Sequence, residues 1–150
     1  PIANRLFSRI KRIVSHEAAT VADETNKLLA AKNPAVDLVK WELSSDHTPE
    51  KRYVPDACDV LANADFFGYG EGLYHPSTVP QLPHPFCNCS TTTVLKDPSE
   101  WFSEDRPVPD KPDVDESRVR DVMGEGTENH IQHQTKMLRT AFERSHANPR

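Results

Sequence analysis

The chain has 150 residues, of which 36% are hydrophobic and 27% are charged, and its formal net charge is -5 at pH 7. This length suits one domain and excludes a multi-domain enzyme. No window approaches the run of about 18 apolar residues that a membrane-spanning helix needs, so no membrane partner is expected. The negative charge excludes a protein whose whole surface binds nucleic acid, and any contact with DNA is expected to be local.

A long amphipathic helix is predicted at residues 1–33. Apolar side chains recur every three or four residues from Phe7 to Leu28, and Asn33-Pro34 is typical of a helix end. Four basic residues crowd its first half, namely Arg5, Arg9, Lys11 and Arg12. This half is either a solvated face or a contact surface for DNA or a protein partner, and the sequence leaves both readings open.

Residues 34–96 are predicted to form a small core of mixed α and β structure. Residues 36–43 alternate apolar and polar side chains, which indicates a half-buried strand, and the β-branched residues 90–95 suit a second strand paired with it. Between them, a short helix is expected to begin at Pro55 and end near Asn63, before a glycine-containing loop and a proline-rich extended segment. The expected fold class is therefore α+β.

The remainder of the chain is predicted to be an arm. Residues 97–126 carry ten acidic and four basic side chains with prolines between them, a composition typical of a linker. Within this linker, Trp101-Phe102 is expected to anchor the arm on a neighbouring surface rather than stay a free hydrophobic pair. Residues 127–150 are predicted to hold a narrower amphipathic helix that docks on a partner.

All three cysteines lie in the predicted core, with histidines near them in the sequence. An odd number of cysteines that includes a C-x-C pair suits a disulfide framework poorly. Three thiols and one imidazole instead suit a tetrahedral structural zinc site, which would cross-link a core that has few apolar residues. The candidate ligands are Cys58, Cys87 and Cys89, with either His84 or His47 as the fourth. The alternative is three reduced cysteines beside unrelated surface histidines.

Spacing does not choose between His84 and His47 as the fourth ligand. The histidine that is not used is expected to hydrogen-bond a ligand or Asp56. A catalytic zinc site is less favoured, because a Cys₃His set leaves no open position and thiolates lower the Lewis acidity of the metal. A cysteine nucleophile paired with His84 is also less favoured, because no third residue is identifiable to orient the base.

Three runs of sequence carry a resemblance to a known family. They are Trp41–His47, Pro55–Asp59 and Val79–Cys89, and they follow one another around a glycine-bearing loop. In this order and spacing the chain resembles the phage Mu F-like minor head protein family, also called the head morphogenesis family, over roughly residues 10 to 95. It differs from the family pattern at Asn88, where an Arg is common, and at His16-Glu17, where a Thr-Glu pair is common.

The resemblance implies a structural protein of the head of a tailed double-stranded DNA bacteriophage. Its partners would be the portal or the major capsid protein, with a local contact to packaged DNA through the N-terminal helix and no small-molecule substrate. Its location would be the virion, in the head interior or at the portal vertex, after assembly in the host cytoplasm. The resemblance thus favours a binding protein rather than an enzyme. The alternatives are a zinc-dependent DNA-binding module and an HNH-like nuclease.

Overall fold

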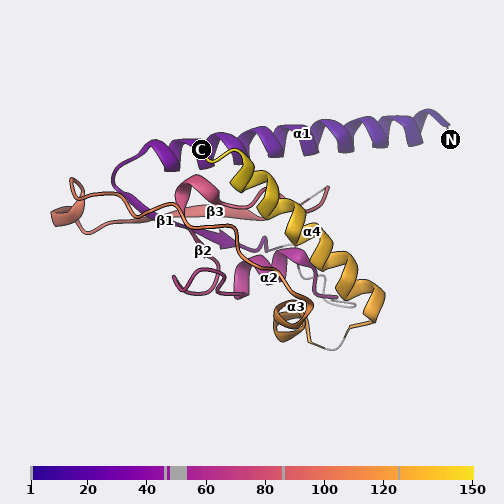
Figure 1. The fold of residues 1–150 in the computed structure, drawn as a ribbon. Coiled ribbons are helices and arrows are strands. Elements are labelled where there is room, and N and C mark those ends of the chain that lie inside the picture. The colour runs from indigo at the N-terminus through magenta and orange to yellow at the C-terminus, as the bar shows by residue number, and fades with distance from the viewer. Residues whose placement is uncertain (1, 46, 48–53, 86, 125) are drawn as a thin grey trace.

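The computed structural model describes residues 2–45, 47, 54–85, 87–124 and 126–150. Helices surround a small antiparallel sheet, which confirms the predicted α+β class (Figure 1). The elements in chain order are α1 (Ile2–Lys32), β1 (Val36–Glu42), α2 (Ala57–Asn63), β2 (Leu73–Tyr74), the 3₁₀ turn η1 (Pro76–Thr78), β3 (Ser90–Leu95), the 3₁₀ turn η2 (Pro98–Glu100), α3 (Glu116–Met123) and α4 (Glu128–Ala147). No helix in these described ranges is long and apolar enough to cross a membrane.

The sheet has β1 at its centre, in the order β2-β1-β3. Val39 pairs with Tyr74 of β2 on one side and with Thr93 of β3 on the other, and both pairings are antiparallel. Val39 and Trp41 are almost fully buried, as their alternation with polar residues predicts. The predicted pairing of the two longer strands is therefore confirmed, while β2 lies in the segment that was predicted as a loop.

Gly72 explains how β2 reaches the sheet. Its φ is +68°, and a Cβ at this position would lie 2.6 Å from the carbonyl oxygen of Ala62 in α2. The Gly72 carbonyl accepts a hydrogen bond from the Trp41 N–H at 2.8 Å, and its own N–H donates to the Ala64 carbonyl at 3.1 Å. Glycine thus lets the chain pass close to α2 and enter the sheet. A strand of two residues is too short to show the alternation that identifies strands in a sequence.

Helix α4 closes the apolar core of its own chain, which corrects the prediction of a partner-docking helix. Ile131, Leu138 and Phe142 are fully buried. The Phe142 ring centroid lies 4.8 Å from that of Phe66 and 6.2 Å from that of Tyr74. The glycine-containing loop and β2 therefore supply the aromatic surface on which α4 packs. An amphipathic stripe predicts that a helix is covered, but it does not identify what covers it.

The acidic segment is not a free linker, which corrects a second prediction. It contains α3, whose Val119 is fully buried. The Asp115 carboxylate caps this helix by accepting a hydrogen bond from the Arg118 N–H at 2.8 Å. Upstream of α3, the Arg106 guanidinium donates to both carboxylate oxygens of Asp37, at 3.0 and 2.9 Å. Capping and the burial of a few apolar residues determine this conformation. The charged composition of the whole segment therefore does not reveal the helix.

Among the described residues, the buried positions of helix α1 lie in its C-terminal half. Lys27 is fully buried, forms an ion pair with Asp23, and donates to the Pro80 carbonyl at 2.6 Å. Its Nζ also lies 5.3 Å from the centroid of the Trp41 ring. Burial lowers the pKa of Lys27 and raises the pKa of Asp23, so each charge depends on the other. Figure 1 shows the N-terminal half of α1 extending beyond the core, and residues 2–15 are all exposed.

We expect Lys27→Met to lower the free energy of unfolding by about 3–5 kcal/mol, because it leaves the buried Asp23 carboxylate and the Pro80 carbonyl without their partner. Lys32→Met is the matched control, since it removes an exposed ammonium from the same helix. Urea denaturation followed by circular dichroism measures both variants. Equal stability of the two variants would contradict the assigned role of Lys27.

Candidate metal centre

The first turn of α2 places Cys58 at the centre of the site. Asp56 precedes the helix as its N-cap, and its Oδ1 accepts a hydrogen bond from the Cys58 N–H at 2.8 Å. In return, Asp59 Oδ2 accepts from the Asp56 N–H at 2.8 Å, which completes a reciprocal capping box. Cys58 is fully buried. The local hydrogen bonds of this turn therefore fix the direction of its thiol.

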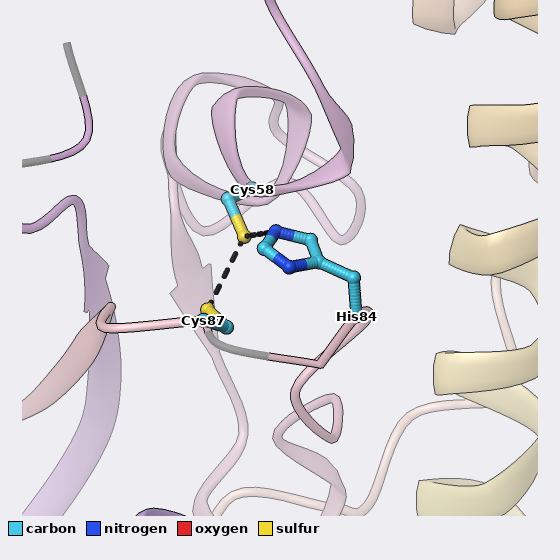
Figure 2. A group of neighbouring side chains, drawn as sticks. All are labelled: Cys58, His84 and Cys87. Atoms are coloured by element: carbon cyan, nitrogen blue, oxygen red, sulfur yellow. Dashed lines mark hydrogen bonds between the residues drawn. The ribbon is translucent and has the colours of Figure 1, made fainter. Parts of the chain in front are cut away.

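The segment before β3 brings two further donor atoms to Cys58. The Cys58 Sγ lies 3.1 Å from His84 Nε2 and 3.4 Å from Cys87 Sγ (Figure 2). These three donor atoms all lie within 4.8 Å of one another, as a metal ion would require. Residues far apart in the sequence thus meet at one point, and Figure 2 shows the His84 ring and the Cys87 sulfur both directed at the Cys58 sulfur.

The hydrogen bond of the second ring nitrogen sets the chemistry of His84. Its Nδ1 lies 3.0 Å from the Pro85 carbonyl oxygen. A carbonyl only accepts, so Nδ1 carries a proton. The hydrogen bond to the Asp56 carboxylate raises the pKa of the imidazole, so a metal ion at Nε2 would have to displace a proton from this nitrogen. A histidine that binds a metal commonly donates its other N–H to a backbone carbonyl or carboxylate, as Nδ1 does here.

Cys89 completes a cluster of three thiols. Hydrogen bonds from Cys58 and Cys87 lower the pKa of Cys89 to about 3, and the Ser44 N–H also contributes. Hydrogen bonds to Cys87 and Cys89, together with burial, raise the pKa of Cys58. Cys89 is not a member of the compact group formed by Cys58, His84 and Cys87, although its pKa depends on both of their thiols. Three neighbouring cysteine sulfurs are suitable donors for a soft or borderline metal ion.

His47 belongs to a second group, with Asp56 and Asp59. Its Nε2 lies 3.1 Å from Asp59 Oδ2 and 3.5 Å from Asp56 Oδ1. Burial opposes a charge on His47, but the hydrogen bond to Asp59 and the nearby Asp56 outweigh it and raise the pKa of the imidazole. His84 Nε2 lies 3.3 Å from Asp56 Oδ2, so Asp56 joins the two groups. The structure therefore places His84 among the thiols and His47 beside the carboxylates.

Asp59 is the residue whose role the sequence reasoning missed. In the sequence it is one of several carboxylates near Cys58, and only its spacing from Asp56 sets it apart. Two residues three apart around a helix start, both able to accept a backbone N–H, are a capping-box pattern. That pattern could have assigned Asp59 to the support of the site.

Comparison with known proteins adds no relative. No protein-family model, no curated protein and no solved structure matches the chain. The function must therefore be argued from the residues themselves, and the resemblance to the Mu F-like family stays a prediction.

We expect the purified chain to hold one metal ion and Cys87→Ser to lose it, because the substitution removes a buried sulfur from the compact group. Asn88→Ser is the control, since it changes the neighbouring residue and removes no donor of the group. Elemental analysis gives the stoichiometry, and thermal melting with and without a chelator gives the coupling to folding. A wild-type chain whose melting is insensitive to chelators would contradict a structural metal.

We expect Cys89, and not His47, to be the fourth donor. In the cobalt-substituted protein, Cys89→Ser should then lose about one third of the thiolate-to-cobalt charge-transfer absorption, because one of three sulfurs is gone. His47→Gln should leave both this absorption and the cobalt d–d bands unchanged, since His47 contacts Asp59 and Asp56 instead. Charge-transfer absorption that Cys89→Ser leaves intact, with d–d bands that His47→Gln shifts, would assign the fourth position to His47.

Proposed function

We propose that the group of Cys58, His84 and Cys87, with Cys89 as the fourth donor, binds a structural zinc ion. Zinc accepts three thiolates and one imidazole in tetrahedral geometry. With Zn–S bonds of about 2.3 Å, two sulfurs of a tetrahedral site lie about 3.8 Å apart. With Zn–N bonds of about 2.0–2.1 Å, a sulfur and a nitrogen of such a site lie about 3.5 Å apart. The 3.4 Å between the Cys58 and Cys87 sulfurs and the 3.1 Å from the Cys58 sulfur to His84 Nε2 are each shorter than the matching separation. An outward movement of a few tenths of an ångström would admit the ion.

The proposed ion acts as a cross-link rather than as a catalyst. With four protein donors the coordination shell is closed, so no position is left for a substrate or an activated water. The side chains nearest the group are likewise engaged in structural contacts. Asp56 and Asp59, the carboxylates that could serve as a base, cap α2 and contact His47. These contacts favour a binding protein over an HNH-like nuclease.

We propose that the chain is a minor structural protein of a tailed double-stranded DNA phage head, which binds portal or capsid subunits in the virion. One observation carries this proposal: two of the sequence runs that resemble the Mu F-like family contribute side chains to the same group of donors. Pro55–Asp59 supplies Cys58, and Val79–Cys89 supplies His84 and Cys87. Residues that give a family its pattern are expected to converge when their purpose is a shared metal site.

The surfaces proposed for partners are those that the core leaves exposed. They are the N-terminal half of α1 and Trp101-Phe102, whereas α4 is excluded because its apolar face is buried. Local contact with packaged DNA through the basic residues of α1 is the alternative for the first surface. It is less favoured, because a phosphate backbone would leave the exposed apolar side chains of this half uncovered.

We expect the chain to co-purify with phage heads at a fixed copy number, because a structural component is retained through density-gradient purification. Quantitative mass spectrometry of gradient-purified heads of the phage that encodes the chain measures the copies per particle. Cys87→Ser should lower incorporation, whereas Asn88→Ser should not, because only the first removes a donor of the group. Heads of full infectivity that lack the chain would overturn the proposed function and leave the metal site untouched.

A further inference from the structure

Two exposed surfaces of opposite charge lie at opposite ends of the molecule. The first, here called the basic helix end, is residues 2–15 of α1, which carry four basic side chains and no acidic one. The second, here called the acidic turn, is residues 97–105 around η2, which carry four acidic side chains and no basic one. Figure 1 shows the N-terminus at one end of the fold and the turn that follows β3 at the other.

Both surfaces also present large apolar side chains to solvent. On the basic helix end, Phe7 is 70% exposed and Ile10 is 51% exposed. On the acidic turn, Phe102 is 96% exposed, and Trp101 beside it is 39% exposed. Apolar side chains flanked by charges of one sign are the composition of a contact site with a polar rim. The two surfaces are therefore complementary, because both present apolar side chains and their charges are opposite.

Each surface is held on a rigid support. The acidic turn is fixed by the buried Lys96, whose ammonium donates to Asp105 Oδ1 at 2.9 Å and whose carbonyl accepts from the Trp101 Nε1–H at 3.2 Å. The basic helix end continues a helix that Lys27 fixes to the core. Rigid presentation lowers the entropic cost of association. The two surfaces lie at opposite ends of the fold, so they do not meet within one chain.

We propose that the chain associates head to tail with a second copy of itself, with the basic helix end of one copy on the acidic turn of the next. This inference goes beyond the proposed function and does not rest on it. The contact joins two different surfaces, so it can repeat from copy to copy, and it closes into a ring or continues as a filament depending on the rotation between copies. Opposite charges make the association dependent on ionic strength.

Other occupants fit the two surfaces less well. Side-by-side pairing of two α1 helices in parallel would place the four basic side chains of one helix beside those of the other. Nucleic acid would neutralise the basic helix end but would be repelled by the acidic turn, and Phe102 would stay exposed. A second copy covers both surfaces with the same kind of contact, and in an open assembly one surface at each end stays free for the portal or capsid contact proposed above.

Two double variants separate the two surfaces. Arg9→Glu with Arg12→Glu brings the basic helix end to zero net charge, and Glu100→Lys with Glu104→Lys does the same for the acidic turn. All four side chains are exposed, so the fold is expected to persist, which circular dichroism and metal content verify. Sedimentation velocity on the nuclease-treated full chain measures the mass-average size over concentration and salt.

The wild-type chain should form species that grow with concentration and dissociate in high salt, while each double variant alone should associate at least about tenfold more weakly. An equimolar mixture of the two variants should form a one-to-one heterodimer and stop there. The mixture keeps one intact pair of surfaces. They are the acidic turn of the Arg9→Glu/Arg12→Glu variant and the basic helix end of the Glu100→Lys/Glu104→Lys variant.

Phe102→Ser should also weaken the wild-type association, whereas Val108→Ser, which removes an exposed apolar side chain outside the acidic turn, should not. A wild-type chain that stays monomeric at submillimolar concentration in low salt would overturn the proposal. So would unaltered self-association of the Glu100→Lys/Glu104→Lys variant, which would indicate pairing between helices. Association that is seen only in samples without nuclease treatment would also overturn it, by assigning the contact to nucleic acid.

Discussion

The structure depends on the closure between Cys58 at the start of α2 and the donors that precede β3. His84 and Cys87 reach Cys58 from the segment after β2, whose described residues contain no α-helix and one 3₁₀ turn. Joining residues so far apart in the sequence costs chain entropy, and few apolar contacts are available here to offset it. A metal ion bound only by the folded chain would supply that free energy. The donor cluster therefore adds to the apolar core, of which Cys58 and Cys87 are members.

The proline-rich segment between η1 and Cys87 shows why polar contacts hold this part of the chain. Proline has no N–H to donate, so the segment cannot extend the sheet as a regular strand. Its carbonyls are instead bound by long cationic side chains. The Pro80 carbonyl accepts from Lys27 at 2.6 Å, and the Val79 carbonyl accepts from Arg150 at 3.0 Å. Arg150 also forms an ion pair with Glu24 of α1 at 2.7 Å, so the last residue helps to fix the first helix.

Elements that show a periodic pattern in the sequence could be predicted. The segments against which an element packs could not. The long helix and the pairing of β1 with β3 follow from apolar spacing and β-branched composition. The place of α4 could not be predicted, because its stripe fits an external partner as well as the Phe66 and Tyr74 rings that it meets. Likewise, α3 depends on one capping carboxylate and a buried Val119, which the acidic composition conceals.

The candidate site shows the same division. Residue types and clustering identify the cysteines and histidines as candidate donors, but spacing leaves His84 and His47 equivalent. The three-dimensional positions separate them, because the Pro85 carbonyl orients the ring of His84 and the capping carboxylates engage His47. The segment that carries His84 also begins at Pro80, which Lys27 holds. Order at the donor cluster and the direction in which α1 leaves the core are therefore fixed by one stretch of chain. Disruption of the donor cluster would therefore loosen the support of the basic helix end as well as the site.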